Sequence, residues 1–274
     1  MPDSEGVAEI AGARLEYSWH RPSPGAAPAR PTLVFLHEGL GCVAMWRDFP
    51  EQLAVATGLG ALVYSRRGYG GSDPVYVPRP LSYMHDEAFE TLGPLLDHFA
   101  ISSAVLVGHS DGASIAAIYA GGVRDPRVRG LVLMAPHFIV EDISVSSIAA
   151  AKTAFETTGL RDKLARYHGA NTDCAFWGWN GAWLDPEFRK WDIGEYLPGI
   201  SVPTLIIQGE NDEYGTVRQV EVAQEKCSCP LQVALLADCG HTPFRDQPEA
   251  VLDTAGRFIG ALPGVKERQA GYLA

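Results

Sequence analysis

The sequence predicts an α/β fold in which helices cover both faces of a mostly parallel sheet. Short apolar runs rich in Val, Leu and Ile recur six times and show little strict alternation, which is typical of strands buried on both faces. Helical patterns separate these runs, and regular alternation of strand and helix indicates a parallel sheet. A chain of 274 residues, 46% of them hydrophobic, is long enough to bury such a core.

The positions of the predicted strands locate the motifs along the chain. Residues 13–20 alternate between apolar and polar side chains, which predicts an antiparallel strand at the edge of the sheet. The six buried strands are predicted within residues 31–39, 60–68, 103–112, 129–137, 202–212 and 231–241.

Helical patterns fill the intervals between the strands. They cover residues 46–58, 85–100, 111–122, 216–226 and 247–262. Residues 138–200 break the rhythm, because they contain helix-like stretches and little strand signal. We therefore predict a helical cap at 138–200, inserted into a core domain formed by residues 1–137 and 201–274.

Charge and composition exclude several classes of partner. The net charge is −11 and no long run of Lys and Arg occurs, so we expect neither nucleic acid nor an anionic membrane surface as partner. The first ten residues lack the apolar segment of a signal peptide, and no apolar stretch reaches the roughly 18 residues of a membrane span. We expect a cytoplasmic protein with five reduced cysteines. The histidines and cysteines show no metal-binding spacing, so no metal site is predicted.

Residues 105–116, VLVGHSDGASIA, place Ser110 between two glycines at the junction of a predicted strand and a predicted helix. A serine hydroxyl becomes nucleophilic only beside a base that an acid orients. The strand, turn and helix supply the context that a G-x-S-x-G nucleophile requires. The glycines bracket Ser110 rather than Asp111, so we predict Ser110 as the nucleophile and keep Asp111 as the alternative.

The partners of such a serine occur at the ends of two later strands. Asp212 follows the strand at 202–212 and His241 follows the strand at 231–241, which gives the chain order Ser, Asp, His. Glu210 and Glu213 remain alternatives for the acid. The glycine-rich segment after residues 31–36 is predicted to supply one N–H of an oxyanion hole, and the N–H of Asp111 the other.

These motifs resemble those of the α/β-hydrolase superfamily, and the resemblance spans nearly the whole chain. The matching segments are His37-Glu38-Gly39, residues 65–73, residues 108–112, residues 209–212 and Gly240-His241. The resemblance implies an eight-stranded α/β-hydrolase fold with a cap. It also implies the oxyanion donors Gly39 and Asp111, the roles of Ser110, Asp212 and His241, and no cofactor.

Two residues depart from the family pattern: Glu38 stands where glycine is usual, and Ser65 where aspartate is frequent. A carboxylate beside an oxyanion hole is unfavourable. We therefore expect Glu38 to point away from the hole or to be paired; the alternative is a second acid–base group.

Aromatic residues of the predicted cap are candidates for the substrate pocket. We predict that it is lined by Glu38, Trp46, His137, Trp177, Trp179 and Trp183. The alternative for the cap tryptophans is that they pack the cap onto the sheet.

The function that follows is a serine hydrolase of small carboxylic esters, lactones or thioesters, similar to esterases and enol-lactone hydrolases. One alternative is a carbon–carbon bond hydrolase of a vinylogous diketone from aromatic ring cleavage. Another is a non-catalytic ligand-binding relative. The expected partner is a small-molecule substrate, and the sequence allows a homodimer.

Overall fold

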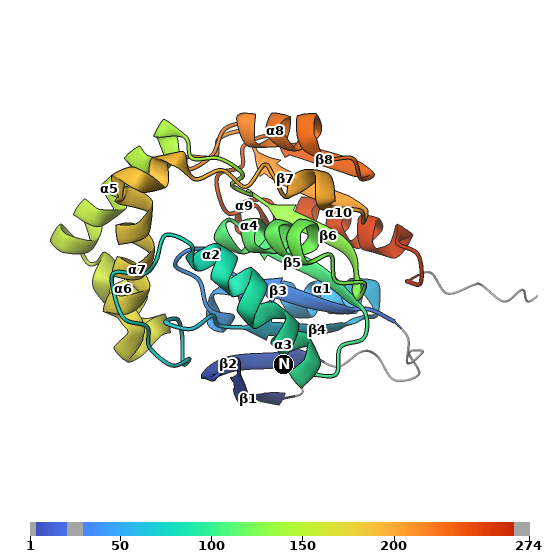
Figure 1. The fold of residues 1–274 in the computed structure, drawn as a ribbon, viewed down its shortest axis with the longest axis horizontal. Helices are drawn as coiled ribbons and strands as arrows, with labels where there is room; N and C mark the ends of the chain where they lie inside the picture. The colour runs from blue at the N-terminus through green and yellow to red at the C-terminus, as the bar shows by residue number, and fades with distance from the viewer. Residues whose placement is uncertain (1–3, 21–29, 266–274) are drawn as a thin grey trace, which may run out of the picture.

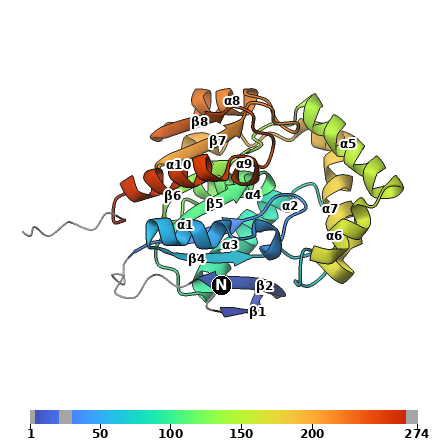
Figure 2. The ribbon, with the colours of Figure 1, turned by 180° about the vertical axis from the view of Figure 1, so that it is seen from behind.

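The computed structural model describes residues 4–20 and 30–265. The ends of the predicted core domain, residues 1–3 and 266–274, lie outside the described residues. One central sheet has helices in front of it and behind it (Figures 1 and 2). The predicted α/β class is therefore confirmed.

The sheet has eight strands in the order β1-β2-β4-β3-β5-β6-β7-β8, and each of the six apolar runs contains one of them. From β4 to β8 across the sheet, all neighbouring strands are parallel. The strands are β1 Ser4–Ile10, β2 Ala13–His20, β3 Thr32–Leu36, β4 Gly60–Tyr64, β5 Ala104–His109, β6 Val128–Met134, β7 Thr204–Gly209 and β8 Leu231–Leu236.

The strand predicted at 13–20 is antiparallel, but its predicted place at the edge of the sheet is wrong. β2 pairs with β4 on one side and with β1 on the other, so β1 forms the edge. Only Ala8 and Ile10 of β1 are buried. A strand with so few buried side chains carries little apolar pattern, which is why the sequence does not reveal it.

Alternate strand residues enter two separate apolar layers. Val34 and Leu36 pack on the same side as α4, whereas Leu33 and Phe35 pack on the side of α10. Since both faces of each central strand are buried, both sets of positions are apolar. This arrangement explains why the strands appear in the sequence as continuous apolar runs.

Helices cover each face of the sheet. One face is covered by α1 Phe49–Thr57, α9 Pro243–Asp246 and α10 Pro248–Ala261. The other is covered by α2 Tyr83–Asp86, α3 Leu92–His98, α4 Asp111–Ile118 and α8 Arg218–Lys226, with a π-helical segment, Glu87–Thr91, between α2 and α3.

Three helices between β6 and β7 lie together at one end of the sheet (Figure 1). These cap helices are α5 Asp142–Thr157, α6 Leu160–His168 and α7 Thr172–Leu184. Buried side chains from them, such as Ile148 and Trp183, belong to the same apolar cluster as one face of the sheet. The cap helices therefore share a core with the sheet.

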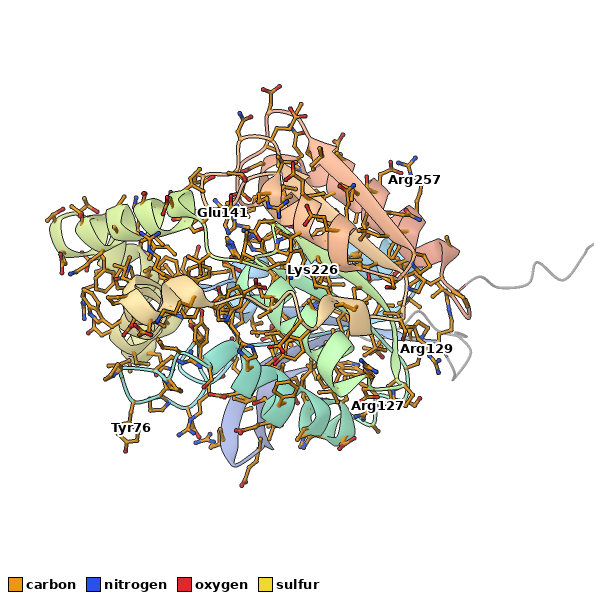
Figure 3. The ribbon with its side chains drawn as sticks, turned by 45° about the horizontal axis from the view of Figure 1, so that its top comes forward. Tyr76, Arg127, Arg129, Glu141, Lys226 and Arg257 are labelled. Atoms are coloured by element: carbon orange, nitrogen blue, oxygen red, sulfur yellow. The ribbon has the colours of Figure 1, made fainter. Side chains whose placement is uncertain are left out.

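Glu141, labelled in Figure 3, directly precedes α5 and binds two residues near α8. Its carboxylate accepts hydrogen bonds from Gln219 Nε2 at 2.6 Å and from Thr216 Oγ1 at 2.5 Å. Thr216 lies just before α8 and Gln219 lies in its first turn, so the beginning of the cap is joined to the chain that follows β7.

The helices of residues 4–20 and 30–265 include none with both the length and the apolar character that crossing a bilayer requires. Charged side chains such as Arg129 and Arg257 project from the molecule (Figure 3).

The close approach of α4 to β3 predicts opposite effects for two Gly→Ala substitutions. A Cβ at Gly112 would overlap the carbonyl oxygen of Leu36, whereas a Cβ at Gly181 in α7 meets nothing within 4 Å. We expect Gly112→Ala to lower the free energy of unfolding by about 1–3 kcal/mol. Gly181→Ala, its control, should raise it by about 0.5–1 kcal/mol because alanine is the better helix former. Urea unfolding measures both, and equal effects would contradict the prediction.

Candidate active site

Ser110 occupies a sharp turn between β5 and α4. Its backbone has φ 53° and ψ −120°, a conformation that non-glycine residues rarely adopt and that is found at functional sites. A Cβ at Gly108 would lie 2.5 Å from Cα of Ala113. The two glycines of the motif are therefore required because the backbone on either side of Ser110 leaves no room for side chains.

The hydroxyl of Ser110 faces the imidazole of His241. The Ser110 Oγ and His241 Nε2 atoms are 2.9 Å apart, and His241 Nδ1 is 2.8 Å from Asp212 Oδ1. With the Nδ1 proton donated to Asp212, Nε2 is free to accept the proton of the Ser110 hydroxyl. Ser110 and Asp212 each follow the carboxyl end of a parallel strand, which is where open α/β sheets place their sites.

Several donors hold the carboxylate of Asp212 in its ionised form. Tyr214 and Gly215 donate backbone N–H groups to Oδ1 at 2.8 and 3.1 Å, and Gln208 Nε2 donates to Oδ2 at 2.7 Å. Burial acts to raise the pKa of Asp212, but the hydrogen bonds with His241 and Tyr214 keep the pKa below its ordinary value. A charged carboxylate on the His241 ring stabilises the imidazolium form.

The alternative acids and the alternative nucleophile occupy other positions. Glu213 accepts the backbone N–H of His241 at 3.1 Å rather than contacting its ring, and Glu210 is exposed. The carboxylate of Asp111 accepts a hydrogen bond from Tyr83 Oη at 2.5 Å. Ser110, Asp212 and His241 are therefore the residues whose side chains are brought together.

A pocket of about 230 Å³ opens beside Ser110. Gly39 and Asp111 both line it, and Asp111 is the first residue of α4, where backbone N–H groups have no partner within the helix. A Cβ at Gly39 would overlap the indole of Trp179, so the loop after β3 lies directly against α7. The two expected oxyanion donors thus border the same pocket as the serine.

Glu38 is paired with His109, in agreement with the expectation that its carboxylate points away from the oxyanion hole or is paired. Its Oε2 lies 3.4 Å from Nδ1 of His109, and His109 Nε2 donates to the carbonyl oxygen of His241 at 2.6 Å. Burial acts to lower the pKa of His109, but the contact with Glu38 raises it above its ordinary value. Burial acts in the opposite direction on Glu38, and the contact with His109 lowers the pKa of that carboxyl to about 2. Both ring nitrogens of His109 face oxygen acceptors, an arrangement that favours the protonated ring because it can donate to both.

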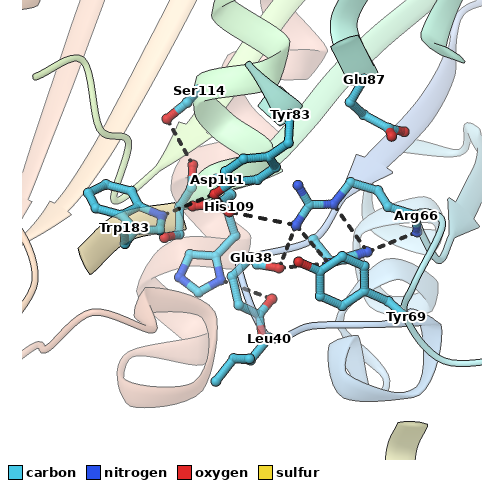
Figure 4. A network of polar contacts seen from close by, with 12 residues as sticks. Glu38, Leu40, Arg66, Tyr69, Tyr83, Glu87, His109, Asp111, Ser114 and Trp183 are labelled. Carbon is cyan, nitrogen blue, oxygen red and sulfur yellow. Dashed lines mark hydrogen bonds and ion pairs between the residues drawn. The ribbon is translucent and has the colours of Figure 1, made fainter. Parts of the chain in front are cut away.

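A second polar network lies beneath the turn, as Figure 4 shows. Tyr83 Oη, which donates to Asp111, accepts a hydrogen bond from Trp183 Nε1 at 3.0 Å. The buried guanidinium of Arg66 lies 3.9 Å from the same carboxylate and donates to the carbonyl oxygen of Glu38 at 2.9 Å. Burial raises the pKa of Asp111, which the nearby Arg66 only partly offsets.

The structure divides the six predicted pocket residues into two groups. Glu38, His137, Trp179 and Trp183 line the pocket. Trp46 and Trp177 lie outside it, which corrects the prediction for these two residues.

Packing explains why Trp46 and Trp177 lie outside the pocket. Trp46 is 1% exposed, and its ring contacts those of Phe49 and Phe244. It therefore belongs to the apolar core between the sheet and α1. Trp177 packs on Phe155 and Phe176 within the cap helices.

The sequence motifs did not indicate Arg66, Tyr83 or the pairing of His109. Arg66 lies inside the matching segment 65–73, so a signal for it existed there. Tyr83 carries no sequence signal, since it reaches Asp111 from another helix only in the folded chain.

Comparison with known proteins shows which family the chain is similar to. A family model described as "Alpha/beta hydrolase family" matches residues 33–254. Proline iminopeptidase of Lactobacillus helveticus is 23% identical over 266 residues, which cover 82% of this chain and 88% of that protein. Epoxide hydrolase 2 of Siraitia grosvenorii is 33% identical over 131 residues, which cover 47% of this chain and only 39% of that protein.

Two solved structures share the fold across nearly the whole chain. The alpha/beta hydrolase MGS-M2 from a Medee basin deep-sea metagenome library has a TM-score of 0.73 at 19% identity and covers 98% of this chain and 100% of that one. The enol-lactonase from Burkholderia xenovorans LB400 has a TM-score of 0.69 at 20% identity and covers 93% and 99%.

The ion pair of Glu38 and His109 predicts a defined pH dependence of stability. His109 has a folded pKa above its ordinary 6.5, so its contribution is complete below pH 6.5 and is lost as the pH rises through the folded pKa. Glu38 has a folded pKa of about 2 against an ordinary 4.5, so its contribution is complete above pH 4.5 and is lost as the pH falls towards 2. Both contributions are complete between pH 4.5 and pH 6.5. In this window Glu38→Gln should lower the free energy of unfolding most, by on the order of 1 kcal/mol.

Urea unfolding at about pH 3, 5.5 and 9 measures this dependence. Glu156→Gln, which removes an exposed ion pair with Lys152, is the control and should have little effect at any pH. A Glu38→Gln loss that is constant across the three pH values would contradict the ion pair.

Proposed function

Since the chain belongs to the alpha/beta hydrolase family, we propose that it is a serine hydrolase that cleaves a small carboxylic ester, lactone or thioester. The observation that carries the proposal is the continuous contact from Ser110 Oγ to His241 Nε2 at 2.9 Å and from His241 Nδ1 to Asp212 at 2.8 Å. These distances allow a proton to move from the hydroxyl to the imidazole without rearrangement.

In the first half of the proposed reaction, Ser110 Oγ attacks the substrate carbonyl carbon while His241 takes the hydroxyl proton. The carbonyl oxygen becomes an oxyanion, and the N–H groups of Gly39 and Asp111 are the proposed donors to it. Asp212 stabilises the imidazolium that forms. The imidazolium then protonates the leaving oxygen or sulfur, the bond to the leaving group breaks, and the acyl group stays on Ser110.

In the second half, a water molecule replaces the leaving group. His241 takes a proton from the water as its oxygen attacks the acyl carbon, and the same donors hold the second oxyanion. The bond to Ser110 Oγ breaks and His241 returns the proton to it. The products are a carboxylic acid and the free serine.

The lining of the pocket supports a small acyl group. The space of about 230 Å³ is bordered by Leu40, Ile148, Trp179 and Trp183, and cavities of about 150 Å³ already accept a benzene ring. The enol-lactonase among the structural neighbours supports the ester and lactone class by its name.

Ser110→Ala should remove most ester hydrolysis, by a factor on the order of 10⁴–10⁶, because the nucleophile is lost. The measurement is release of nitrophenol from acetate, butyrate and benzoate esters by the wild type and the variant. Ser146→Ala, an exposed serine of α5, is the matched control and should keep full activity. Hydrolysis that survives in Ser110→Ala would refute the proposal. If the wild type cleaves no ester but cleaves a vinylogous diketone, the function is carbon–carbon hydrolysis instead.

Substitutions of the three neighbouring acids should separate their roles. Asp212→Asn is expected to lower kcat by about 10²–10⁴, less than Ser110→Ala, because an amide no longer stabilises the imidazolium. Glu210→Gln should keep near wild-type rates, and Glu213→Gln should lose less than tenfold in kcat, since Glu213 contacts only the backbone N–H of His241. A fully active Asp212→Asn beside an inactive Glu213→Gln would reverse the assignment.

A further inference from the structure

His137 is a buried polar residue whose ring has no partner. It is 3% exposed, and its Nδ1 atom is fully buried without a hydrogen bond. Among residues 4–20 and 30–265, no side chain or backbone group bonds to either ring nitrogen. Only its backbone is engaged, through Ser114 Oγ. Nδ1 lies toward Gly215, 3.6 Å from where a Cβ of that residue would stand, so Nε2 is the ring nitrogen that a ligand in the pocket could reach. It has no hydrogen-bond partner among the described residues, and polar atoms in native proteins nearly always have one.

The ring forms one wall of the pocket beside Ser110. Its centroid lies 5.5 Å from that of His241 and 5.0 Å from that of Trp183. The His137 ring therefore lies close both to the imidazole that faces Ser110 and to the indole of Trp183.

His137 is neutral at physiological pH. Burial, together with the nearby His241, lowers its pKa to about 3. A neutral imidazole has one N–H donor and one acceptor nitrogen, which suits an uncharged hydroxyl or carbonyl. It offers no charge to a carboxylate.

The other polar groups of the pocket point to the same class of ligand. Glu38, Asp111 and Glu213 are among its described lining residues, which include no Lys or Arg. A negatively charged substrate would lose its hydration there and meet no Lys or Arg, and the lining ring of His109 is already paired with Glu38. The side chains of Trp179 and Trp183 supply flat apolar area for a ring.

We propose that His137 is a specificity-determining residue that hydrogen-bonds a neutral hydroxyl or carbonyl on a single-ring acyl group lying against Trp179 and Trp183. This inference rests on the proposed function, because it names the acyl group that the same site accepts. It assigns the unpartnered ring to substrate and predicts that uncharged oxygenated rings are preferred over apolar and anionic ones.

The test is a calorimetric titration with ketones, which bind without being hydrolysed. The probes are para- and meta-hydroxybenzyl methyl ketone, their two methyl-for-hydroxyl twins, and the para-carboxy analogue. At least one hydroxyl ligand should bind the wild type roughly three- to tenfold more tightly than its methyl twin. The carboxy analogue should bind most weakly. Methyl twins that bind as tightly as both hydroxyl ligands would overturn the proposal.

Variants of His137 show whether this residue causes the preference. In His137→Leu the hydroxyl-to-methyl ratio should fall to one or below while the affinity for the methyl twins stays within about twofold. His137→Gln, which keeps a hydrogen-bonding group, should retain part of the ratio and serves if His137→Leu does not fold. His85→Leu is the matched control, because His85 also has an unpartnered Nδ1 but packs on Phe89 and Tyr196 outside the pocket. An unchanged ratio in His137→Leu or His137→Gln would overturn the proposal.

The titration and the ester assay can fail independently. Selective ketone binding that depends on His137, without Ser110-dependent ester hydrolysis, would support this inference and refute the serine hydrolase. Ester hydrolysis that depends on Ser110, without a His137-dependent ratio, would support the hydrolase and refute the role of His137.

Discussion

The backbone turn at Ser110 is the constraint on which the rest of the site depends. A serine with φ 53° joins β5 directly to α4, and the turn fits only because α4 approaches the carbonyl oxygen of Leu36 at Gly112 without a side chain between them. Leu36 ends β3, and the loop that follows carries Gly39. The contact that presents the serine therefore also brings the glycine loop to the same pocket. In this way one close backbone approach positions both the proposed nucleophile and the loop proposed to hold the oxyanion.

Glu38, which departs from the family pattern, pairs with His109, and this pair connects three loops of the site. Glu38 belongs to the loop after β3, His109 ends β5, and the carbonyl oxygen that His109 contacts belongs to His241. The carboxylate would be unfavourable if it were unpaired beside a developing oxyanion. Paired with His109, it instead joins the three segments that carry Gly39, Ser110 and His241. The hydrogen bond to the His241 backbone restrains the residue whose ring must stay within reach of Ser110.

The cap helices contact the site through two tryptophans of α7. Trp179 lies against Gly39, and Trp183 is linked through Tyr83 to the carboxylate of Asp111. Both residues of the expected oxyanion hole are thus in contact, directly or through one tyrosine, with the same helix. The cap shares its apolar core with the sheet, so its position relative to Ser110 is fixed by packing as well as by these polar contacts. The same two indole rings border the space in which His137 lacks a partner.

The sequence by itself determined the α/β class, six buried strands of a mostly parallel sheet, the helix-like character of the interval 138–200 and the positions of Ser110, Asp212 and His241 in the chain. These features are local: strand burial leaves continuous apolar runs, and a strand-to-helix turn leaves glycines on both sides of a serine.

The sequence did not reveal β1, because only Ala8 and Ile10 of that strand are buried. Nor did it separate Trp179 and Trp183, which line the pocket, from Trp177, which does not, since all three belong to the same tryptophan-rich segment. The pairing of Glu38 with His109, the link from Trp183 to Asp111 and the unpartnered ring of His137 were decided only by the tertiary structure. Each of them depends on side chains from segments distant in the sequence, and only the packing of the folded chain sets which of those side chains meet.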